Sequence, residues 1–266
     1  MKISSSTADK QTASIQKKKH LGQNFLEDRN ILELEVKLAD ISGKNVLEIG
    51  PGDGRLTRVL LAQKPKKLTI VEKDPRFVEI LKEKFGRKEY EDSIQIIETD
   101  FLELDLSKLE FDVVIGNIPY YISSPIIFKL ANYKFEHAVL MVQREFAQKM
   151  IQKPGSKSYG RLSVTSQLAF DVKIERIVSR QVFKPTPRVD SALIILKPTG
   201  RKLTEFDENI IRYLFQHKNK TVRNALLDSK EFDKTILEKI GPFAERRART
   251  LTKEECLEIA KLLYER

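Results

Sequence analysis

Between Asn45 and Gln143, short β-rich segments alternate with segments of helical periodicity, and this alternation constrains the fold most strongly. The β-rich segments are NVLEIG, KLTIVE, SIQIIE, FDVVIGN and HAVLMVQ, and the first three are separated by RLTRVLLAQ and PRFVEILKEKF. Stretches such as VVIG and VLMV are continuously apolar, as expected for strands that helices cover on both faces of a parallel sheet. The sequence therefore predicts an α/β fold with a doubly wound, Rossmann-like sheet.

The segments that follow extend this sheet and then change in character. SVTSQLAF at 163–170 and SALIILK at 191–197 are predicted to be strands that extend the sheet in the antiparallel direction. Beyond residue 200 the patterns are helical only: FDENIIRYLFQ, TVRNALLDS, KTILEKI and KEECLEIAKLLYE. The first nineteen residues are polar and Lys-rich, and we expect them to be disordered. We therefore expect a disordered basic tail at 1–19, an α/β domain at 20–200 and a helical domain at 201–266.

Composition narrows the classes of partner. With 48 Lys and Arg against 38 Asp and Glu, the net charge of +10 favours a polyanionic partner, and nucleic acid is the first candidate. No apolar run approaches the roughly 18 residues of a membrane span, and the amino terminus lacks the apolar core of a secretory signal. We expect a cytoplasmic, monomeric protein with no membrane contact. One cysteine and three scattered histidines exclude a disulfide or zinc scaffold, so we expect no metal site.

Three acidic or glycine-rich positions follow successive predicted strands. The turn GPGDG at 50–54 precedes a helix, and its glycines, Gly50 and Gly52 among them, permit close approach of a ligand to the backbone. This turn alone is compatible with NAD and with S-adenosylmethionine (SAM). Glu72 ends KLTIVE, where a carboxylate can accept both ribose hydroxyls of either ligand. Asp100 follows SIQIIE and is suited to accept an adenine amine, or to cap a local turn.

The segment Gly116-Asn117-Ile118-Pro119-Tyr120 favours one chemistry. An exocyclic amine on a nucleobase is a poor nucleophile because its lone pair is delocalised into the ring. The Asn117 oxygen and the Ile118 carbonyl, held by the fixed φ of Pro119, can accept hydrogen bonds from the amine and orient its lone pair. Tyr120 can stack on a base that has left its helix. The motif predicts methyl transfer from SAM to a nucleobase nitrogen.

With these motifs the chain resembles the SAM-dependent ribosomal RNA adenine N6-dimethyltransferases of the KsgA type. The matching stretches within residues 20 to 200 are HLGQNFLEDRNIL, NVLEIGPGDGRLT, VEKDPR, GNIPYYISSPIIFKL, QREFAQKM and FKPTPRVDSALI. The resemblance implies a Rossmann-like SAM-dependent methyltransferase domain with a small carboxyl-terminal helical domain for RNA recognition. It implies SAM as cofactor and small-subunit ribosomal RNA precursor as partner. The implied reaction is N6,N6-dimethylation, at two adjacent adenosines near the 3′ end during ribosome biogenesis.

The resemblance also implies site residues. For the cofactor these are Asn24 and Leu26 at the entrance, Gly50 and Gly52 at the methionine, Glu72 at the ribose, Asp100 at the adenine and Asn117. For catalysis they are Asn117, Pro119, Tyr120 and Phe183, with the two aromatic rings on either side of the target base. By local pattern alone, Asn24 is also compatible with a helix cap and Phe183 with core packing.

Three other functions stay open, as do the RNA contacts. The chain is compatible with a large-subunit ribosomal RNA adenine methyltransferase that confers antibiotic resistance, and with a non-catalytic ribosome-assembly or transcription factor. An NAD-dependent oxidoreductase would need a proton donor that we do not find. The expected phosphate contacts, each also compatible with a solvated helix face, are Lys17 to Lys19, Lys218, Lys220, Arg223, Arg246, Arg247 and Arg249.

Overall fold

The computed structural model describes residues 24–90 and 92–264 of the chain. The predicted tail at 1–19 lies outside the described residues. Contacts divide the chain into two compact units. The first contains residues up to Lys129 together with Tyr133–Arg144 and Lys173–Leu196, and the second contains Leu130–Asn132, Glu145–Val172 and the residues from Lys197 onward. Residues 145–172 thus group with the carboxyl-terminal helices, whereas we expected them within the α/β domain; separate folding of 201–266 stays a prediction.

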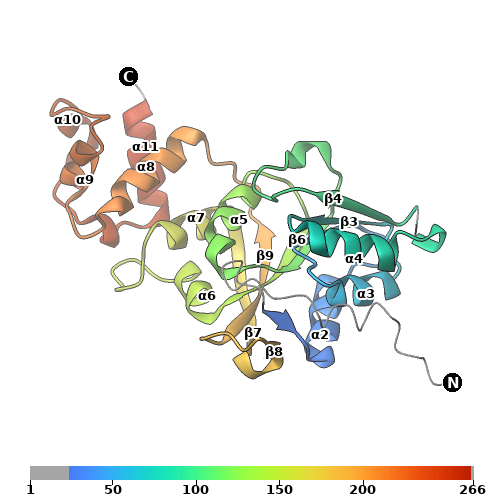
Figure 1. Ribbon diagram of the computed structural model, residues 1–266. Coiled ribbons are helices and arrows are strands. Elements are labelled where there is room, and N and C mark those ends of the chain that lie inside the picture. Colours follow the sequence, from blue (N-terminus) through green and yellow to red (C-terminus); the bar gives the residue numbers. More distant parts are fainter. Residues whose placement is uncertain (1–23, 91, 265–266) are drawn as a thin grey trace. The chain divides into compact units, whose positions relative to one another are not determined.

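A seven-stranded sheet forms the centre of the described part of the first unit (Figure 1). Its strand order is β4 (Ile94–Glu98), β3 (Lys67–Glu72), β2 (Asn45–Ile49), β5 (Val113–Asn117), β6 (His137–Gln143), β9 (Ser191–Pro198) and β7 (Phe170–Val178). The first five strands pair in parallel, and β9 pairs antiparallel with β6. The predicted parallel sheet and the predicted antiparallel strand at 191–197 are therefore confirmed.

The prediction of a strand at 163–170 is wrong. Helix α7 (Arg161–Ala169) occupies this segment, and strand β7 begins only at Phe170. Six residues of α7 are buried, so polar and apolar positions do not alternate with a helical period that a sequence pattern would reveal. The hydroxyls inside it have local partners: Ser163 Oγ accepts a hydrogen bond from the Gly160 N–H and donates one to the Lys149 carbonyl.

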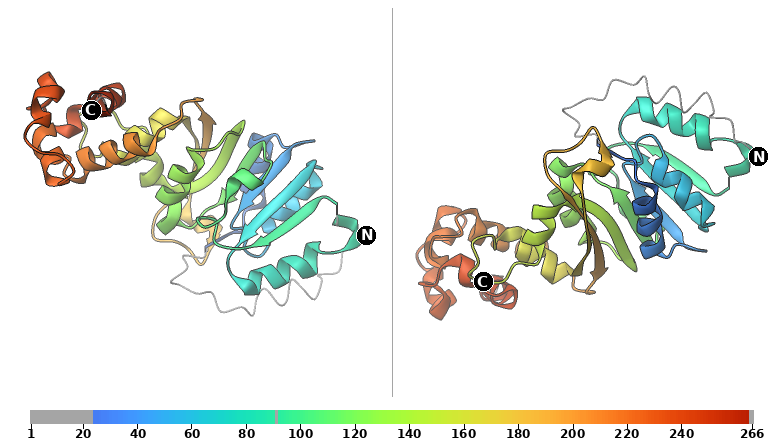
Figure 2. Two further views of the ribbon diagram at one scale, coloured as in Figure 1. Left: turned by 90° about the horizontal axis from the view of Figure 1, so that it is seen from above. Right: turned by 90° about the horizontal axis from the view of Figure 1, so that it is seen from below.

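Helices cover the sheet and bring the ends of the parallel strands to one edge. Helices α2 (Arg29–Ala39), α3 (Arg55–Ala62) and α4 (Pro75–Phe85) share one hydrophobic cluster with the strands (Figure 2). Helix α5 (Ser123–Leu130) contributes Ile126 and Ile127, which are fully buried. Because β2 to β5 run parallel, the turns after these strands lie at the same edge of the sheet. Within residues 24–90 and 92–264, no helix has both the length and the apolar character needed to span a membrane.

The second unit is helical, as predicted for the residues beyond 200. Its elements are α6 (Arg144–Met150), whose first residue belongs to the other unit, α7, α8 (Glu205–Gln216), α9 (Val222–Asp228), α10 (Ile236–Ile240) and α11 (Lys253–Tyr264). A hydrophobic cluster joins these helices and includes Cys256, whose side chain is fully buried. The expected role of this thiol in packing is thereby confirmed.

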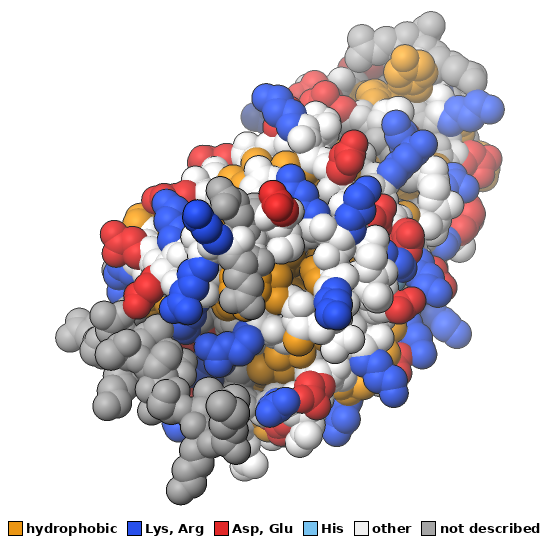
Figure 3. Space-filling view, turned by 90° about the vertical axis from the view of Figure 1, so that its right-hand side faces the viewer, with side chains coloured by type: hydrophobic (Ala, Val, Ile, Leu, Met, Phe, Trp, Pro, Cys, Tyr) orange, Lys and Arg blue, Asp and Glu red, His pale blue; other side chains and the backbone are white. Residues whose placement is uncertain are grey.

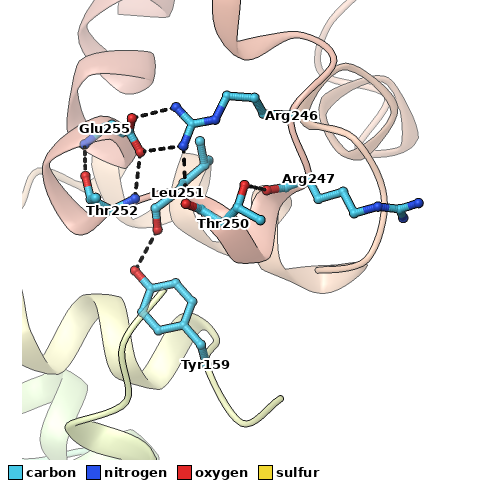
Figure 4. Close-up of polar contacts among 7 residues, drawn as sticks. All are labelled: Tyr159, Arg246, Arg247, Thr250, Leu251, Thr252 and Glu255. Atoms are coloured by element: carbon cyan, nitrogen blue, oxygen red, sulfur yellow. Dashed lines mark hydrogen bonds and ion pairs between the residues drawn. The ribbon is translucent and has the colours of Figure 1, made fainter. Parts of the chain in front are cut away.

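Polar contacts fix the segment that leads into α11 (Figure 4). Thr252 and Glu255 form a reciprocal cap, since the Thr252 N–H donates to Glu255 Oε2 and the Glu255 N–H donates to Thr252 Oγ1. The Arg246 guanidinium contacts both Glu255 oxygens, at 2.5 and 3.0 Å, and donates to the Thr250 carbonyl. The Tyr159 hydroxyl donates to the Leu251 carbonyl at 2.9 Å. These contacts satisfy backbone groups that the helix itself leaves unpaired.

We expect Tyr159→Phe to lower the free energy of unfolding by about 1–3 kcal/mol, because the buried Leu251 carbonyl would lose its donor. Urea denaturation followed by circular dichroism measures this change. The matched control is Tyr264→Phe, since Tyr264 is 71% exposed and its hydroxyl can be replaced by water contacts. Equal effects of the two substitutions would contradict a specific contribution of the Tyr159 hydroxyl.

Candidate functional site

One cavity in the first unit brings the expected site residues together. Its empty volume is about 1150 Å³ with open solvent included, and it lies where the turns after β2, β3, β4 and β5 meet. All ten residues expected at the site line it: Asn24, Leu26, Gly50, Gly52, Glu72, Asp100, Asn117, Pro119, Tyr120 and Phe183. The sequence therefore identified residues that are distant along the chain and adjacent in the fold, while their individual roles stay predictions.

Glu72 and the glycine turn form one wall of the cavity. Gly52 has a φ of +56°, and a Cβ atom there would lie 2.9 Å from the ring of Phe25, so a side chain would need that ring to move. The Gly52 N–H donates to Glu72 Oε2 at 3.1 Å, and the N–H groups of Lys73 and Asp74 donate to Glu72 Oε1, both at 2.9 Å. Burial raises the pKa of Glu72, and these three donors act in the opposite direction. Glu72 thus holds the turn while its carboxylate also lines the cavity.

Asp100 has both of the local roles that its sequence position allowed. Its Oδ1 accepts from the Leu102 N–H at 2.9 Å, which closes a turn after β4. Its Oδ2 lies 3.5 Å from the Nζ atom of Lys73, which is also 5.5 Å from the centre of the Tyr121 ring. Both Lys73 and Tyr121 line the cavity, and sequence reasoning missed them. The position of Lys73 directly after Glu72 was the available signal.

Asn117 ends β5 with an unsatisfied acceptor. Its Oδ1 is buried and has no hydrogen-bond partner among the described residues. Buried amide oxygens usually have a donor, so an orphaned oxygen in a cavity wall suits a ligand that brings one. Pro119 follows with a φ of −59°, and Tyr120 starts a short 3₁₀ turn. The Tyr120 hydroxyl lies 2.7 Å from Ser191 Oγ, and burial raises the pKa of this tyrosine, which stays neutral.

The outer residues of the site come together through a small second sheet. Strand β1 (Phe25–Leu26) pairs antiparallel with β8 (Phe183–Lys184), so that Leu26 lies opposite Phe183. The Phe183 ring is 3% exposed, belongs to the hydrophobic core and also lines the cavity. The cap of α2 is Asp28, which accepts from two N–H groups of its first turn. The alternative role of Asn24 as a helix cap is therefore wrong.

Two buried carboxyl groups near the cavity were missed by the sequence reasoning. Glu48 in β2 is fully buried, lines the cavity and accepts from Thr57 Oγ1 at 2.7 Å. Glu35 in α2 is also fully buried. Burial raises the pKa of each to about 8, and the charge of Glu48 adds to the effect on Glu35. A single acid within the apolar run NVLEIG was a signal for Glu48.

These buried acids predict that stability falls as the pH rises. In the unfolded chain each carboxyl ionises near 4.5, whereas in the folded protein Glu48 keeps its proton up to about pH 8. Between these values the unfolded state releases its proton first, so each such group lowers the free energy of unfolding by about 1.4 kcal/mol per pH unit. Above pH 8 its loss is complete. Urea denaturation at pH 5, 6.5 and 8 should show a shallower decline for Glu48→Gln than for wild type, and parallel curves would contradict the assignment.

The expected phosphate-binding residues of the helical unit have partners within the protein. Lys218 donates to the carbonyls of Lys157 and Tyr159, and Arg246 is held by Glu255. Ion pairs or a backbone carbonyl also engage Lys220, Arg223 and Arg247. On the face in Figure 3, Lys and Arg side chains are distributed among Asp and Glu around an exposed hydrophobic area. A role of these cations in RNA binding stays a prediction; across the described residues, no group of three or more His, Cys, Asp or Glu side chains is arranged to hold a metal ion.

Comparison with known proteins supports this description of the site. The family model for ribosomal RNA adenine dimethylase matches residues 14–265. The chain is 43% identical over 256 residues to a Thermococcus onnurineus protein named "Probable ribosomal RNA small subunit methyltransferase A", with 91% of each chain covered. It is 41% identical to the "Ribosomal RNA small subunit methyltransferase A" of Chlorobium limicola, with 92% of each covered.

Two solved structures are similar in fold and in sequence. The crystal structure of a dimethyladenosine transferase from Plasmodium falciparum has a TM-score of 0.74 and 31% identity, covering 88% of this chain and 95% of that one. The 23S rRNA methyltransferase ErmE has a TM-score of 0.62 and 28% identity, covering 91% of this chain and 100% of that one. Both similarities extend over nearly the whole chain, so the Rossmann-like methyltransferase fold expected from the sequence is confirmed.

Proposed function

Because this chain belongs to the ribosomal RNA adenine dimethylase family, we propose that it transfers methyl groups from SAM to the N6 amine of adenosines in small-subunit ribosomal RNA. The family supports the reaction, and the relatives that carry the small-subunit name support the substrate. The observation that carries the chemistry is the buried, unpartnered Oδ1 of Asn117 in the wall of the cavity.

The cavity residues fit SAM. The Gly50–Gly52 turn leaves room for a ligand against the backbone, because a Cβ at Gly50 would have only a Pro119 carbon at 3.9 Å as its neighbour within 4 Å. The Glu72 carboxylate can accept the ribose hydroxyls, and Asp100 Oδ2 can accept the adenine amine if it exchanges its 3.5 Å contact with Lys73. When bound, SAM supplies a methyl group on a positively charged sulfur that leaves as a neutral thioether.

The residues after β5 would make the target amine reactive. Asn117 Oδ1 accepts a hydrogen bond from the adenine amine, which localises the nitrogen lone pair and directs it at the methyl carbon. The N–C bond forms as the S–C bond breaks, and the amine, positively charged and acidic after transfer, loses its proton to water. Tyr120, fixed through Ser191, and Phe183 hold the base between their rings. A second transfer requires space for the first methyl group and a fresh SAM molecule.

For the substrate, we extend the proposal to two adjacent adenosines near the 3′ end of the small-subunit RNA, modified during ribosome biogenesis. An adenine amine is accessible only when the base is unstacked, which costs least in loops and single strands of RNA. The alternative of a large-subunit enzyme has support from the similarity to ErmE, at a lower TM-score and identity than the dimethyladenosine transferase. A non-catalytic factor would not need the arrangement around Asn117.

The test offers the purified protein small and large ribosomal subunits that lack the modification, together with methyl-labelled SAM. Digestion of the RNA and mass spectrometry identify the methylated nucleosides and their positions. We expect N6,N6-dimethyladenosine in the small-subunit RNA only. Label in the large-subunit RNA would support the alternative enzyme, and RNA binding without label would support a non-catalytic factor; either result would overturn the proposal.

A further inference from the structure

Glu35 is a charged residue on the apolar face of a helix. In α2 it shares the buried face with Ile31, Leu32, Val36 and Ala39, which pack into the main hydrophobic cluster of the first unit. Its side chain is 0% exposed, and neither carboxyl oxygen has a hydrogen bond that meets strict distance and angle limits. A buried acid without a strong partner destabilises the fold, which indicates a contribution other than stability.

The polar side chains around Glu35 belong to the candidate site. Helix α2 packs on β5 and β6, and this brings Glu35 to the side chain of Asn117 at the end of β5 and near Glu48 in β2. The Asn117 amide lies close enough to lower the pKa of Glu35, against the larger opposing effect of burial. At neutral pH the acid is therefore mostly protonated, and its carbonyl oxygen is available as an acceptor.

We propose that Glu35 is a positioning residue that accepts a hydrogen bond from the Nδ2 group of Asn117 and so directs Asn117 Oδ1 into the cavity. This inference rests on the proposed function, in which Oδ1 accepts from the target amine. An asparagine amide has an oxygen and an NH₂ group of nearly the same shape, and a rotation of 180° exchanges them. If they were exchanged, an NH₂ group would face the amine of the substrate, and two donors would oppose each other.

The position of Glu35 makes it suited to select one of these two orientations. Asn117 Oδ1 is buried and lacks a donor among the described residues, so no contact on that side of the amide fixes its orientation. An acceptor on the opposite side favours NH₂ there and leaves the oxygen toward the cavity. Because Glu35 lies in the core, its cost in stability is accepted for the orientation of a residue that contacts the substrate.

The test compares Glu35→Met, which removes the acceptor with little change of volume, with Glu35→Gln, which retains a carbonyl acceptor. Ile31→Met is the matched control, since Ile31 is buried in the same helix and does not line the cavity. The measurements are the single-turnover rate of methyl transfer to the small-subunit particle at saturating SAM, the Kd for SAM, and the melting temperature.

We expect Glu35→Met to slow methyl transfer by about 10-fold or more, since misplacement of a catalytic group by about 1 Å can cost 100-fold. Its melting temperature should be equal to or above that of wild type, because an apolar side chain replaces an acid without a strict hydrogen bond. The Kd for SAM should stay within about twofold. Glu35→Gln should restore most of the rate. A purely structural role predicts the reverse, a lower melting temperature with an unchanged rate in the folded fraction.

A second measurement does not depend on turnover. The side-chain amide of Asn117 is observed by ¹⁵N NMR and assigned by its loss in Asn117→Ala. Its signals should move in Glu35→Met and stay in place in Ile31→Met; signals that do not respond to Glu35→Met overturn the inference. If Asn117→Ala abolishes transfer while Glu35→Met transfers at the wild-type rate, only the role of Glu35 is wrong. If the wild type transfers no methyl group to adenosine, the proposed function fails and this inference fails with it.

Discussion

Replacing Asn117 by alanine is expected to reduce the rate of methyl transfer by about 100- to 1000-fold, the usual effect of removing one preorganised hydrogen bond to a reacting group. The side chain lies at the end of β5, and its buried Oδ1 has no partner among the described residues. Alanine takes away the acceptor that polarises the adenine amine and leaves the rest of the cavity wall in place. Single-turnover transfer from labelled SAM to the small-subunit particle measures the change.

The same variant should bind RNA and SAM almost as wild type does, because Asn117 acts on one amine and few phosphate contacts depend on it. Asn45→Ala is the matched control, since Asn45 begins the neighbouring strand β2 and lies at the opposite edge of the sheet, outside the cavity. An Asn117→Ala enzyme that transfers methyl groups at the wild-type rate would show that the amine needs no acceptor from this position. A parallel loss of RNA binding would instead indicate a structural role.

The parts of the site that sequence identified are those that depend on local order along the chain. Gly52, Glu72, Asp100 and Asn117 each follow a strand, and parallel strands bring their ends to one edge of the sheet. Once the alternation of strands and helices is recognised, the meeting of these residues follows from the topology. No knowledge of side-chain contacts is needed.

The features that the sequence did not predict depend on contacts between distant segments. The pairing of Leu26 with Phe183 joins two strands of two residues each, too short for a recognisable pattern. Burial of Glu35 was hidden because α2 is amphipathic and a glutamate in such a helix is usually exposed. Helix α7 was taken for a strand because a short segment buried on most sides shows no period. In each case tertiary packing decided the outcome.

Substitution of Glu72 by alanine should weaken SAM binding by about 10- to 100-fold, since hydrogen bonds to a charged group contribute about 1.5–3 kcal/mol. Two effects combine in this loss. The carboxylate would no longer accept the ribose hydroxyls, and the N–H groups of Gly52, Lys73 and Asp74 would lose the acceptor that holds the glycine turn. Isothermal titration calorimetry with SAM or its demethylated product measures the affinity.

A ligand change separates the two effects. If Glu72 contacts the ribose, wild type should bind a 2′-deoxy form of the demethylated product more weakly than the ribose form, and Glu72→Ala should bind both about equally. If Glu72 only holds the turn, the ratio of the two affinities should be the same in both proteins, which would reject the ribose contact. Glu98→Ala is the control, because Glu98 pairs in register with Glu72 at the end of β4 and does not line the cavity. Its affinity for either ligand should match that of wild type, since a carboxylate at the same level of the sheet but outside the cavity has no ribose to bind.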